Sequence, residues 1–150
     1  MNVMKCLTAD LVEVPLAGDN KRAVIENMLN LAMRSGRIRD RGKALDCLLK
    51  RERQMSTGMQ CGIAIPHCKT DQVDTLVACI GIKPEGVDFD ALDREPSTIF
   101  VMTISPINQI GPHVQFLAEI SKLLRLESVR QALLAAATPE AVLAILGVPT

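Results

Sequence analysis

Two histidines, His67 and His113, are the only ones in the chain, and their side chains are the best suited to chemistry near neutral pH. His67 follows the apolar run of the segment GIAIPHC (residues 62–68), where Pro66 fixes one backbone angle just before it. His113 stands at the start of an expected helix. Both therefore lie at ends of elements, where α/β folds usually carry their chemistry. Taken singly, each also has a structural interpretation, His67 as a partly buried loop residue and His113 as a helix N-terminal residue.

The segment before the apolar run, RERQMSTG (residues 51–58), supplies polar groups suited to phosphate. It contains Arg51, the hydroxyls of Ser56 and Thr57, and a flexible Gly58. A neutral imidazole nitrogen is a nucleophile near pH 7 when the other ring nitrogen holds the proton. Arginine, backbone N–H groups and hydroxyls are the usual stabilisers of a transferred phosphoryl group. These residues predict a phosphoryl-transfer site in which a second histidine holds the first ring or binds the phosphate.

Composition excludes several classes of function. Seventeen basic and seventeen acidic side chains cancel, which gives no indication of a nucleic-acid partner, and three Phe without Trp or Tyr argue against a platform on which bases or sugars stack. The first residues do not resemble a signal peptide, and no run approaches the roughly 20 apolar residues that span a bilayer. The odd number of cysteines, without a CxxC pair, indicates reduced thiols: Cys6, Cys47, Cys61, Cys68 and Cys79. We expect a cytoplasmic protein with one domain (residues 1–150) and no direct membrane insertion.

Two helices are expected before the candidate site. Asp19 or Asn20 can cap the first, and Gly36 can end it. Its apolar positions recur at helical spacing: Val24, Ile25, Met28, Leu31 and Ala32. A second helix is predicted from about 43 to 53, and it would bury Ala44, Leu45, Leu48 and Leu49.

Three apolar runs with strand character follow, at 63–65, 76–82 and 98–104, with turns expected at 83–86 and 105–106. Helices are then expected from Pro112, near 129–136, and from the Thr138 cap to Leu146, with Gly147 closing the last. The first of these would bury Val114, Leu117, Ile120 and Leu124. Helices, strands and helices in this order predict an α/β fold in layers around a buried sheet.

At this point the sequence resembles the EIIA components of the phosphotransferase system, in the fructose–mannitol (type 2) class that includes the nitrogen-regulatory IIA proteins. Residues 51–69 resemble the first family signature, with its RE, STG and AIPH: RERQMSTGMQCGIAIPHCK. Residues 111–124 resemble the second, in which a histidine begins a Leu-rich helix: GPHVQFLAEISKLL. Residues 86–106 and 7–29 also resemble family segments, so the resemblance covers roughly 7–146.

The resemblance implies a phosphocarrier with phosphotransferase activity. His67 would accept a phosphoryl group on Nε2 from the phosphocarrier protein HPr or its nitrogen-branch equivalent. It would pass the group to a cysteine of a IIB component, or hold it as a signal for a regulated target protein. His113 would be the second active-site histidine, and Arg51 would lie near the phosphate. The implied fold is a mixed, five-stranded sheet flanked by helices on both faces, and no cofactor or metal is implied.

Within that family, a free-standing chain favours the regulatory role over sugar transport, and a IIA-like module that only binds is a further alternative. The mechanism we expect has the donor docking on an apolar rim that includes Ile63, Ile65 and Ile110, while Arg51 and loop N–H groups near Thr57 and Gly58 stabilise the phosphate oxygens.

Two departures from the family pattern are Cys68, where glycine commonly follows the histidine, and Arg94, where a turn glycine or asparagine is common. Two rival sites remain open at this point. One is a zinc site formed by Cys61, His67, Cys68 and His113, although the spacing is unusual for zinc. The other is a hydrolase with Cys68 as nucleophile and His113 as base.

Overall fold

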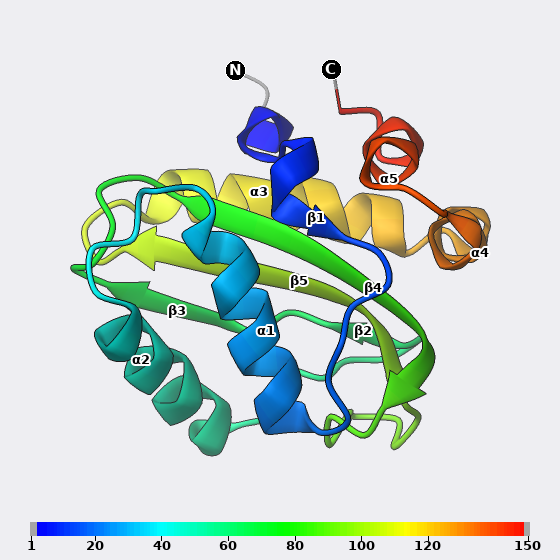
Figure 1. Cartoon of the computed structure of the whole chain (residues 1–150), viewed down its shortest axis with the longest axis horizontal. Coiled ribbons are helices and arrows are strands. Elements are labelled where there is room, and N and C mark those ends of the chain that lie inside the picture. Colours follow the sequence, from blue (N-terminus) through cyan, green and yellow to red (C-terminus); the bar gives the residue numbers. More distant parts are fainter. Residues whose placement is uncertain (1–2, 149–150) are drawn as a thin grey trace.

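The computed structural model describes residues 3–148, and it consists of one mixed five-stranded sheet with helices on both faces (Figure 1). The strands are β1 (Val12–Glu13), β2 (Ile63–Ala64), β3 (His67–Thr70), β4 (Val77–Val87) and β5 (Ser97–Pro106). The helices are α1 (Lys21–Met33), α2 (Arg41–Gln54), α3 (Ile110–Leu124), α4 (Glu127–Ala135) and α5 (Pro139–Ile145), with short 3-10 turns η1 (Val3–Cys6) and η2 (Ala9–Leu11). The predicted α/β fold class is therefore confirmed.

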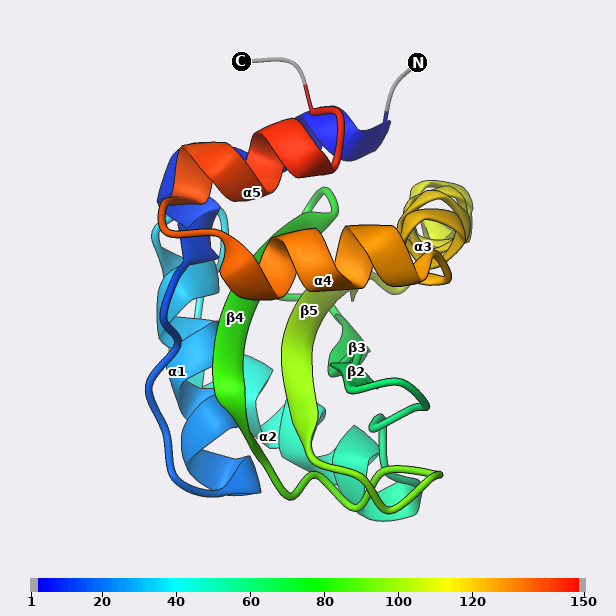
Figure 2. The same ribbon diagram turned by 90° about the vertical axis from the view of Figure 1, so that its right-hand side faces the viewer.

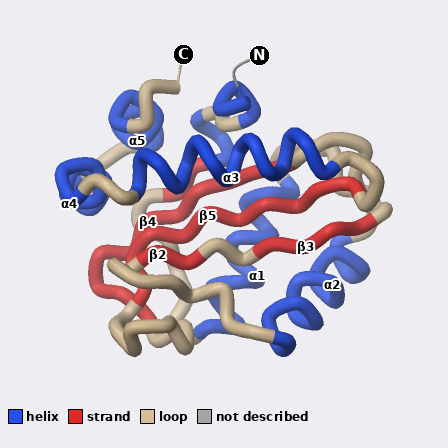
Figure 3. The backbone as a smooth tube through the Cα atoms, turned by 180° about the vertical axis from the view of Figure 1, so that it is seen from behind, coloured by secondary structure: helices blue, strands red, loops and turns tan. Residues whose placement is uncertain are grey.

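The sheet has the order β1-β4-β5-β2, and β3 also pairs with β5. The long central strands β4 and β5 are antiparallel, whereas β1, β2 and β3 pair in parallel with their neighbours. Helices α1 and α2 cover one face, and α3 lies across the other, with α4 and α5 at one end (Figures 1, 2 and 3). Each face has its own core of buried aliphatic side chains, as a sheet covered on both sides requires. None of the helices in the described part of the chain has the length and apolar character needed to cross a membrane.

The two N-terminal helices begin at side-chain caps. Asn20, and not Asp19, caps α1 by accepting a hydrogen bond from the Ala23 N–H at 2.9 Å. Asp40 caps α2 in the same way through the Lys43 N–H, at 3.1 Å. In α2 the prediction that Leu49 is buried is wrong, since it is half-buried, and Glu52 is the buried residue one turn further on.

The predicted turn at 83–86 is wrong, because β4 continues through it to Val87. The pairing with β5 shifts register between Ile82 and Val87, and Gly86 takes a φ of +76° there. In this extension Pro84 and Glu85 are exposed and Lys83 and Gly86 are half-buried, so the strand continues without the apolar pattern that signals a buried strand. The turn expected at 105–106 is wrong as well, because β5 includes both of these residues and the turn follows at 107–108.

Strands β2 and β3 occupy the same edge of β5, and Ile65 and Pro66 separate them. Ile63 pairs with Ile99 in β2, and His67 pairs with Thr103 in β3. The Thr103 N–H donates to the Pro66 carbonyl at 3.1 Å, which keeps the edge attached across the break. The result is that His67 is the first residue of a short strand and not a loop residue.

Helix α3 follows the predicted burial in its C-terminal half and departs from it in its N-terminal half. Its buried residues are His113, Phe116, Ile120 and Leu124, whereas Val114 is 56% exposed. Ile120 and Leu124 were expected to be buried and are, whereas Leu117, also expected to be buried, is half-buried, so the error concerns the N-terminal half of the helix. The consequence is functional, because His113 itself lies on the buried face of the helix.

The C-terminal helices agree with the sequence prediction. Helix α4 spans Glu127–Ala135, and α5 begins after Thr138, whose hydroxyl accepts from the Ala141 N–H at 3.1 Å. Gly147, with a φ of +71°, follows the end of α5.

Candidate functional site

His67 is held with one ring nitrogen fixed by the backbone. Its Nδ1 lies 2.8 Å from the Ile65 carbonyl oxygen, two residues earlier and across Pro66. A carbonyl can only accept, so this contact requires the hydrogen on Nδ1 and leaves the Nε2 of the neutral ring with a free electron pair. The side chain is half-buried, and it lines a surface pocket. This arrangement makes Nε2 the nucleophilic atom of the ring.

His113 lies beside His67 and is buried, with 5% of its surface exposed. The two ring centroids are 5.8 Å apart and the ring planes are tilted by 46°. Its Nε2 forms a 2.9 Å hydrogen bond with the Thr103 hydroxyl, and Thr103 is the residue of β5 that pairs with His67. One residue of the central strand therefore holds the His113 ring and lies next to His67 in the sheet.

The surroundings of His113 favour its neutral form. Burial lowers the pKa of the imidazole, and the electrostatic influence of the neighbouring His67 and Lys69 lowers it further. A neutral second ring beside His67 can accept or donate a hydrogen bond without adding charge to the site.

Arg51 shares a pocket with His67. The pocket has a volume of about 370 Å³. It is lined by Cys47, Lys50, Arg51, Gln54, His67, Cys68 and Lys69. Three of these side chains carry positive charge and none carries negative charge, so the pocket attracts anions. One Arg51 guanidinium nitrogen donates to the Met55 carbonyl at 2.7 Å, which ties the side chain to the end of its own helix.

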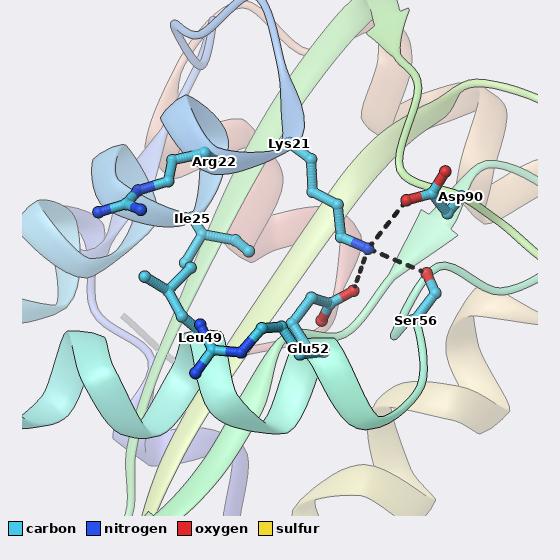
Figure 4. A pocket seen from close by; sticks show the side chains of 8 residues that line it. Lys21, Arg22, Ile25, Leu49, Glu52, Ser56 and Asp90 are labelled. Carbon is cyan, nitrogen blue, oxygen red and sulfur yellow. Dashed lines mark hydrogen bonds and ion pairs between the residues drawn. The ribbon is translucent and has the colours of Figure 1, made fainter.

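The hydroxyls of Ser56 and Thr57 are engaged away from His67. The Ser56 hydroxyl donates to the Phe89 carbonyl at 2.6 Å and accepts from the Gly58 N–H at 3.0 Å. Figure 4 shows it among Lys21, Glu52 and Asp90, in a different pocket.

Thr57 is bound in a similar way. Its hydroxyl and its N–H both donate to the Glu52 carboxylate, at 2.6 and 2.8 Å. Thus Arg51 and His113 each lie beside His67, while the donors of segment 56–58 bind Phe89, Glu52 and, for Gly58, the Ser56 hydroxyl.

Segment 56–58 nevertheless contributes to the site through its backbone. The Thr57 carbonyl accepts from the Ile65 N–H at 3.1 Å, and the Met59 N–H donates to the Ile63 carbonyl at 2.7 Å. The segment thereby fixes Ile65, whose own carbonyl holds the His67 ring. It acts as a support for the histidine.

Glu52 is the residue of this region whose importance sequence reasoning missed. It is 8% exposed, and besides Thr57 it binds the Lys21 ammonium at 2.7 Å. The signal that could have found it is the family's RE pair, in which Arg51 faces the pocket and the following carboxylate faces inward. Thr103 carried no such signal, because a threonine in an apolar strand is indistinguishable from a β-branched core residue.

Of the three isoleucines expected to form an apolar rim, one is well exposed. Ile110, at the start of α3, is 53% exposed, and Ile107 and Val114 beside it in sequence are exposed as well. Ile65 is buried in the core beneath α3 and Ile63 is half-buried, so the expectation for Ile65 is wrong.

The rival sites find no support in the geometry. Within residues 3–148, no group of three or more His, Cys, Asp or Glu side chains is arranged to hold a metal ion. The Cys68 side chain packs into the core beneath α1 and α2, and burial raises the pKa of its thiol. His113 belongs to the helix on the opposite face of the sheet, so Cys68 and His113 do not form a nucleophile–base pair.

Comparison with known proteins decides the family. The family described as "Phosphoenolpyruvate-dependent sugar phosphotransferase system, EIIA 2" matches residues 5–147. The chain belongs to this EIIA type 2 family. The family match covers both histidines, the RE pair and the strands and helices that hold them, and the predicted resemblance is confirmed.

Relatives of this EIIA chain have two kinds of name. The fructose-specific EIIA component of Haloferax volcanii is 38% identical over 133 residues, which are 89% of this chain and 86% of that protein. The nitrogen regulatory protein of Pseudomonas aeruginosa is 34% identical over 131 residues, 87% of this chain and 84% of that protein. The crystal structure of the nitrogen regulatory protein IIA-Ntr from Neisseria meningitidis superposes with a TM-score of 0.89 at 26% identity, covering 97% of this chain and 99% of that one.

Proposed function

We propose that this EIIA chain is a phosphocarrier that accepts a phosphoryl group on Nε2 of His67. The observation that carries the proposal is the 2.8 Å contact between His67 Nδ1 and the Ile65 carbonyl, which leaves Nε2 as the only nitrogen of that ring able to attack. The donor is HPr or its nitrogen-branch equivalent, and the acceptor is a IIB component or a regulated target protein. The whole chain, 1–150, acts as one EIIA unit in the cytoplasm.

The transfer follows from groups around the pocket. The His67 Nε2 attacks the donor's phosphorus in line, so that an N–P bond forms as the donor's own bond to phosphorus breaks. Arg51 and Lys69, which line the pocket with His67, stabilise the negative charge on the phosphoryl oxygens. The neutral His113 beside the ring provides a hydrogen bond without competing for the phosphorus, since its own Nε2 is bound to Thr103. The exposed Ile110 and its apolar neighbours provide the surface on which the donor docks.

Phosphate binding by Ser56, Thr57 and Gly58, which we expected from the sequence, has no part in this mechanism. Their donors already have partners within the protein, so we assign them the support of Ile65 and thus of His67.

Intact-mass analysis tests the proposal. The protein is incubated with phosphoenolpyruvate, enzyme I and HPr or its nitrogen-branch counterpart, in parallel with His67→Ala, His113→Ala and Arg51→Ala. We expect one acid-labile phosphoryl group on the wild type, none on His67→Ala, and slower uptake by the other two. Equal labelling of the wild type and His67→Ala refutes the assignment, and no labelling by any competent donor leaves an EIIA-shaped binding module.

Two biological roles are compatible with this chemistry. We favour the nitrogen-regulatory role, supported by the TM-score of 0.89 with IIA-Ntr. Sugar transport is the second candidate because the fructose-specific relative is 38% identical. That relative is matched over 86% of its length, so chain size does not separate the two roles. The two roles can be separated by the donor that labels His67 faster. Faster labelling by HPr would favour sugar transport, and faster labelling by its nitrogen-branch counterpart would favour regulation.

A further inference from the structure

Two thiols lie side by side at the base of the His67 pocket. Cys47, on α2, and Cys68, on β3, both line the pocket. The Cys47 thiol donates to the Lys69 carbonyl at 3.2 Å, which places it directly against β3, next to Cys68 on that strand. Cys68 is 3% exposed, while Cys47 is half-buried. The pair thus consists of a reachable sulfur and a protected one.

The other cysteines are in different surroundings. Cys61 is exposed on the β2 side of the molecule, and Cys6 lies in η1. Cys79 is fully buried on β4, where its thiol is 3.4 Å from the Met28 carbonyl. The pocket pair is therefore the arrangement that couples two thiols to the candidate site.

We propose that Cys47 and Cys68 form a reversible disulfide in the presence of a peroxide, and that this bond slows phosphoryl transfer to His67. The regulatory half of this inference rests on the function proposed above. The formation of the bond depends only on the two thiols and the oxidant.

The chemistry starts at the more accessible sulfur. The Cys47 thiolate attacks one oxygen of the peroxide, the O–O bond breaks, and a sulfenic acid forms with release of one water after protonation. The Cys68 sulfur then attacks the Cys47 sulfur, the S–S bond forms, and the S–O bond breaks with loss of the second water. Two thiols are oxidised and one hydrogen peroxide is reduced to two waters. Burial raises the pKa of the Cys68 thiol, so we expect the second step to be the slower one.

The disulfide would move a residue that serves the phosphate. Sulfur atoms in contact are about 4 Å apart, whereas bonded sulfurs are about 2 Å apart, so closure draws α2 and β3 together by up to ~2 Å. Arg51 lies one helical turn after Cys47 and shares its face of α2. His67 is the residue before Cys68. Because a misplacement of about 1 Å can cost on the order of 100-fold in rate, we expect labelling of the oxidised protein to be slower by about tenfold or more.

The test uses the full chain with Cys61→Ser, which removes the exposed thiol. The protein is treated with hydrogen peroxide, remaining thiols are alkylated, and the peptides are mapped without reduction. His67 labelling from the phosphoryl donor is timed before oxidation, after it, and after dithiothreitol. Cys47→Ser and Cys68→Ser are carried through the same steps, and each variant is compared with its own reduced form, so that any change in basal rate cancels.

The proposal predicts a Cys47–Cys68 linked peptide, slower labelling that dithiothreitol restores, and no response in either serine variant. Oxidation of Cys61 in the wild-type chain shows that the peroxide treatment works. If the Cys47–Cys68 link does not form under the same treatment, the proposed disulfide is refuted. A link with unchanged labelling overturns its effect on transfer. Should the reduced protein take up no phosphoryl group at all, the proposed function fails instead, and the peptide map still decides whether the disulfide forms.

Discussion

The buried carboxylate of Glu52 offers a sharp test of how the site is supported. Glu52 accepts two hydrogen bonds from Thr57 and pairs with Lys21, and Thr57 in turn fixes Ile65, which holds the His67 ring. The change Glu52→Gln keeps the size of the side chain and removes its charge. It therefore weakens the two hydrogen bonds from Thr57 and removes the ion pair with Lys21, without leaving a cavity.

The expected loss of stability can be built from these contacts. A hydrogen bond to a charged group contributes about 1.5–3 kcal/mol, and one between neutral groups about 0.5–1.5 kcal/mol. Two bonds that lose charge assistance therefore cost about 2 kcal/mol together. The Lys21 side chain is 22% exposed and has Asp90 as a second partner, so loss of the ion pair adds no more than about 1 kcal/mol. We expect a total loss of about 2–3 kcal/mol in the free energy of unfolding.

Urea unfolding measures this change, and Glu119→Gln serves as the matched control because Glu119 is exposed on α3. We expect Glu119→Gln to change stability by less than about 0.5 kcal/mol. Timed labelling of His67 in the same samples should be slower for Glu52→Gln than for the control. Equal stability of the two variants would show that Glu52 does not hold the segment, and a destabilised variant with unchanged labelling would refute the link from Glu52 to His67.

A double-mutant cycle separates the ion pair from the hydrogen bonds. Lys21→Met is made alone and together with Glu52→Gln, and the coupling energy should be at most about 1 kcal/mol, since the pair is partly exposed. A coupling energy above about 2 kcal/mol would mean that the ion pair, and not Thr57, accounts for most of the contribution of Glu52.

Two further predictions concern the same site. In Gly58→Ala the added methyl would lie 2.9 Å from two neighbouring backbone atoms. We therefore expect the free energy of unfolding in urea to fall by about 1–3 kcal/mol and the labelling of His67 to be slower. Gly42→Ala is the control and should not lose stability, because Gly42 lies in a helix and its added methyl would be 3.4 Å from the nearest atom, an ordinary contact. The lowered pKa of His113 means that the unfolded chain binds more protons below about pH 6.5. The free energy of unfolding should therefore fall as the pH falls below about 6.5, and it should fall less in His113→Gln than in the wild type. Equal losses in the wild type and in His113→Gln between about pH 7.5 and 5.5 would contradict this.

The sequence allowed much of the scaffold to be predicted because its signals are local. Asn20 and Thr138 are N-cap residues whose side chains accept hydrogen bonds from the nearby backbone, so the helix starts can be predicted. The spacing of apolar residues identifies which face of α1 is buried. The continuous apolar runs identify the central strands β4 and β5, which are covered on both faces.

The errors arise where long-range contacts decide. Strands β1 and β3 have two and four residues, too few for any periodicity, and they exist because β4 and β5 provide partners. In α3, treating His113 as a polar residue assigned Val114 to the core, whereas Thr103 on the sheet gives the imidazole a buried partner. The same limitation applies to Ser56 and Thr57, whose partners Phe89 and Glu52 cannot be identified from spacing alone.

The most direct test of the central claim is to identify the phosphorylated nitrogen. Protein labelled with ¹⁵N in its histidines is phosphorylated, and the coupling of phosphorus to the ring nitrogens is measured by NMR under alkaline conditions that preserve phosphohistidine. The 2.8 Å contact that holds the hydrogen on Nδ1 predicts a single phosphoryl group on Nε2 of His67. Coupling to Nδ1 of that ring, or to either nitrogen of His113, would contradict it.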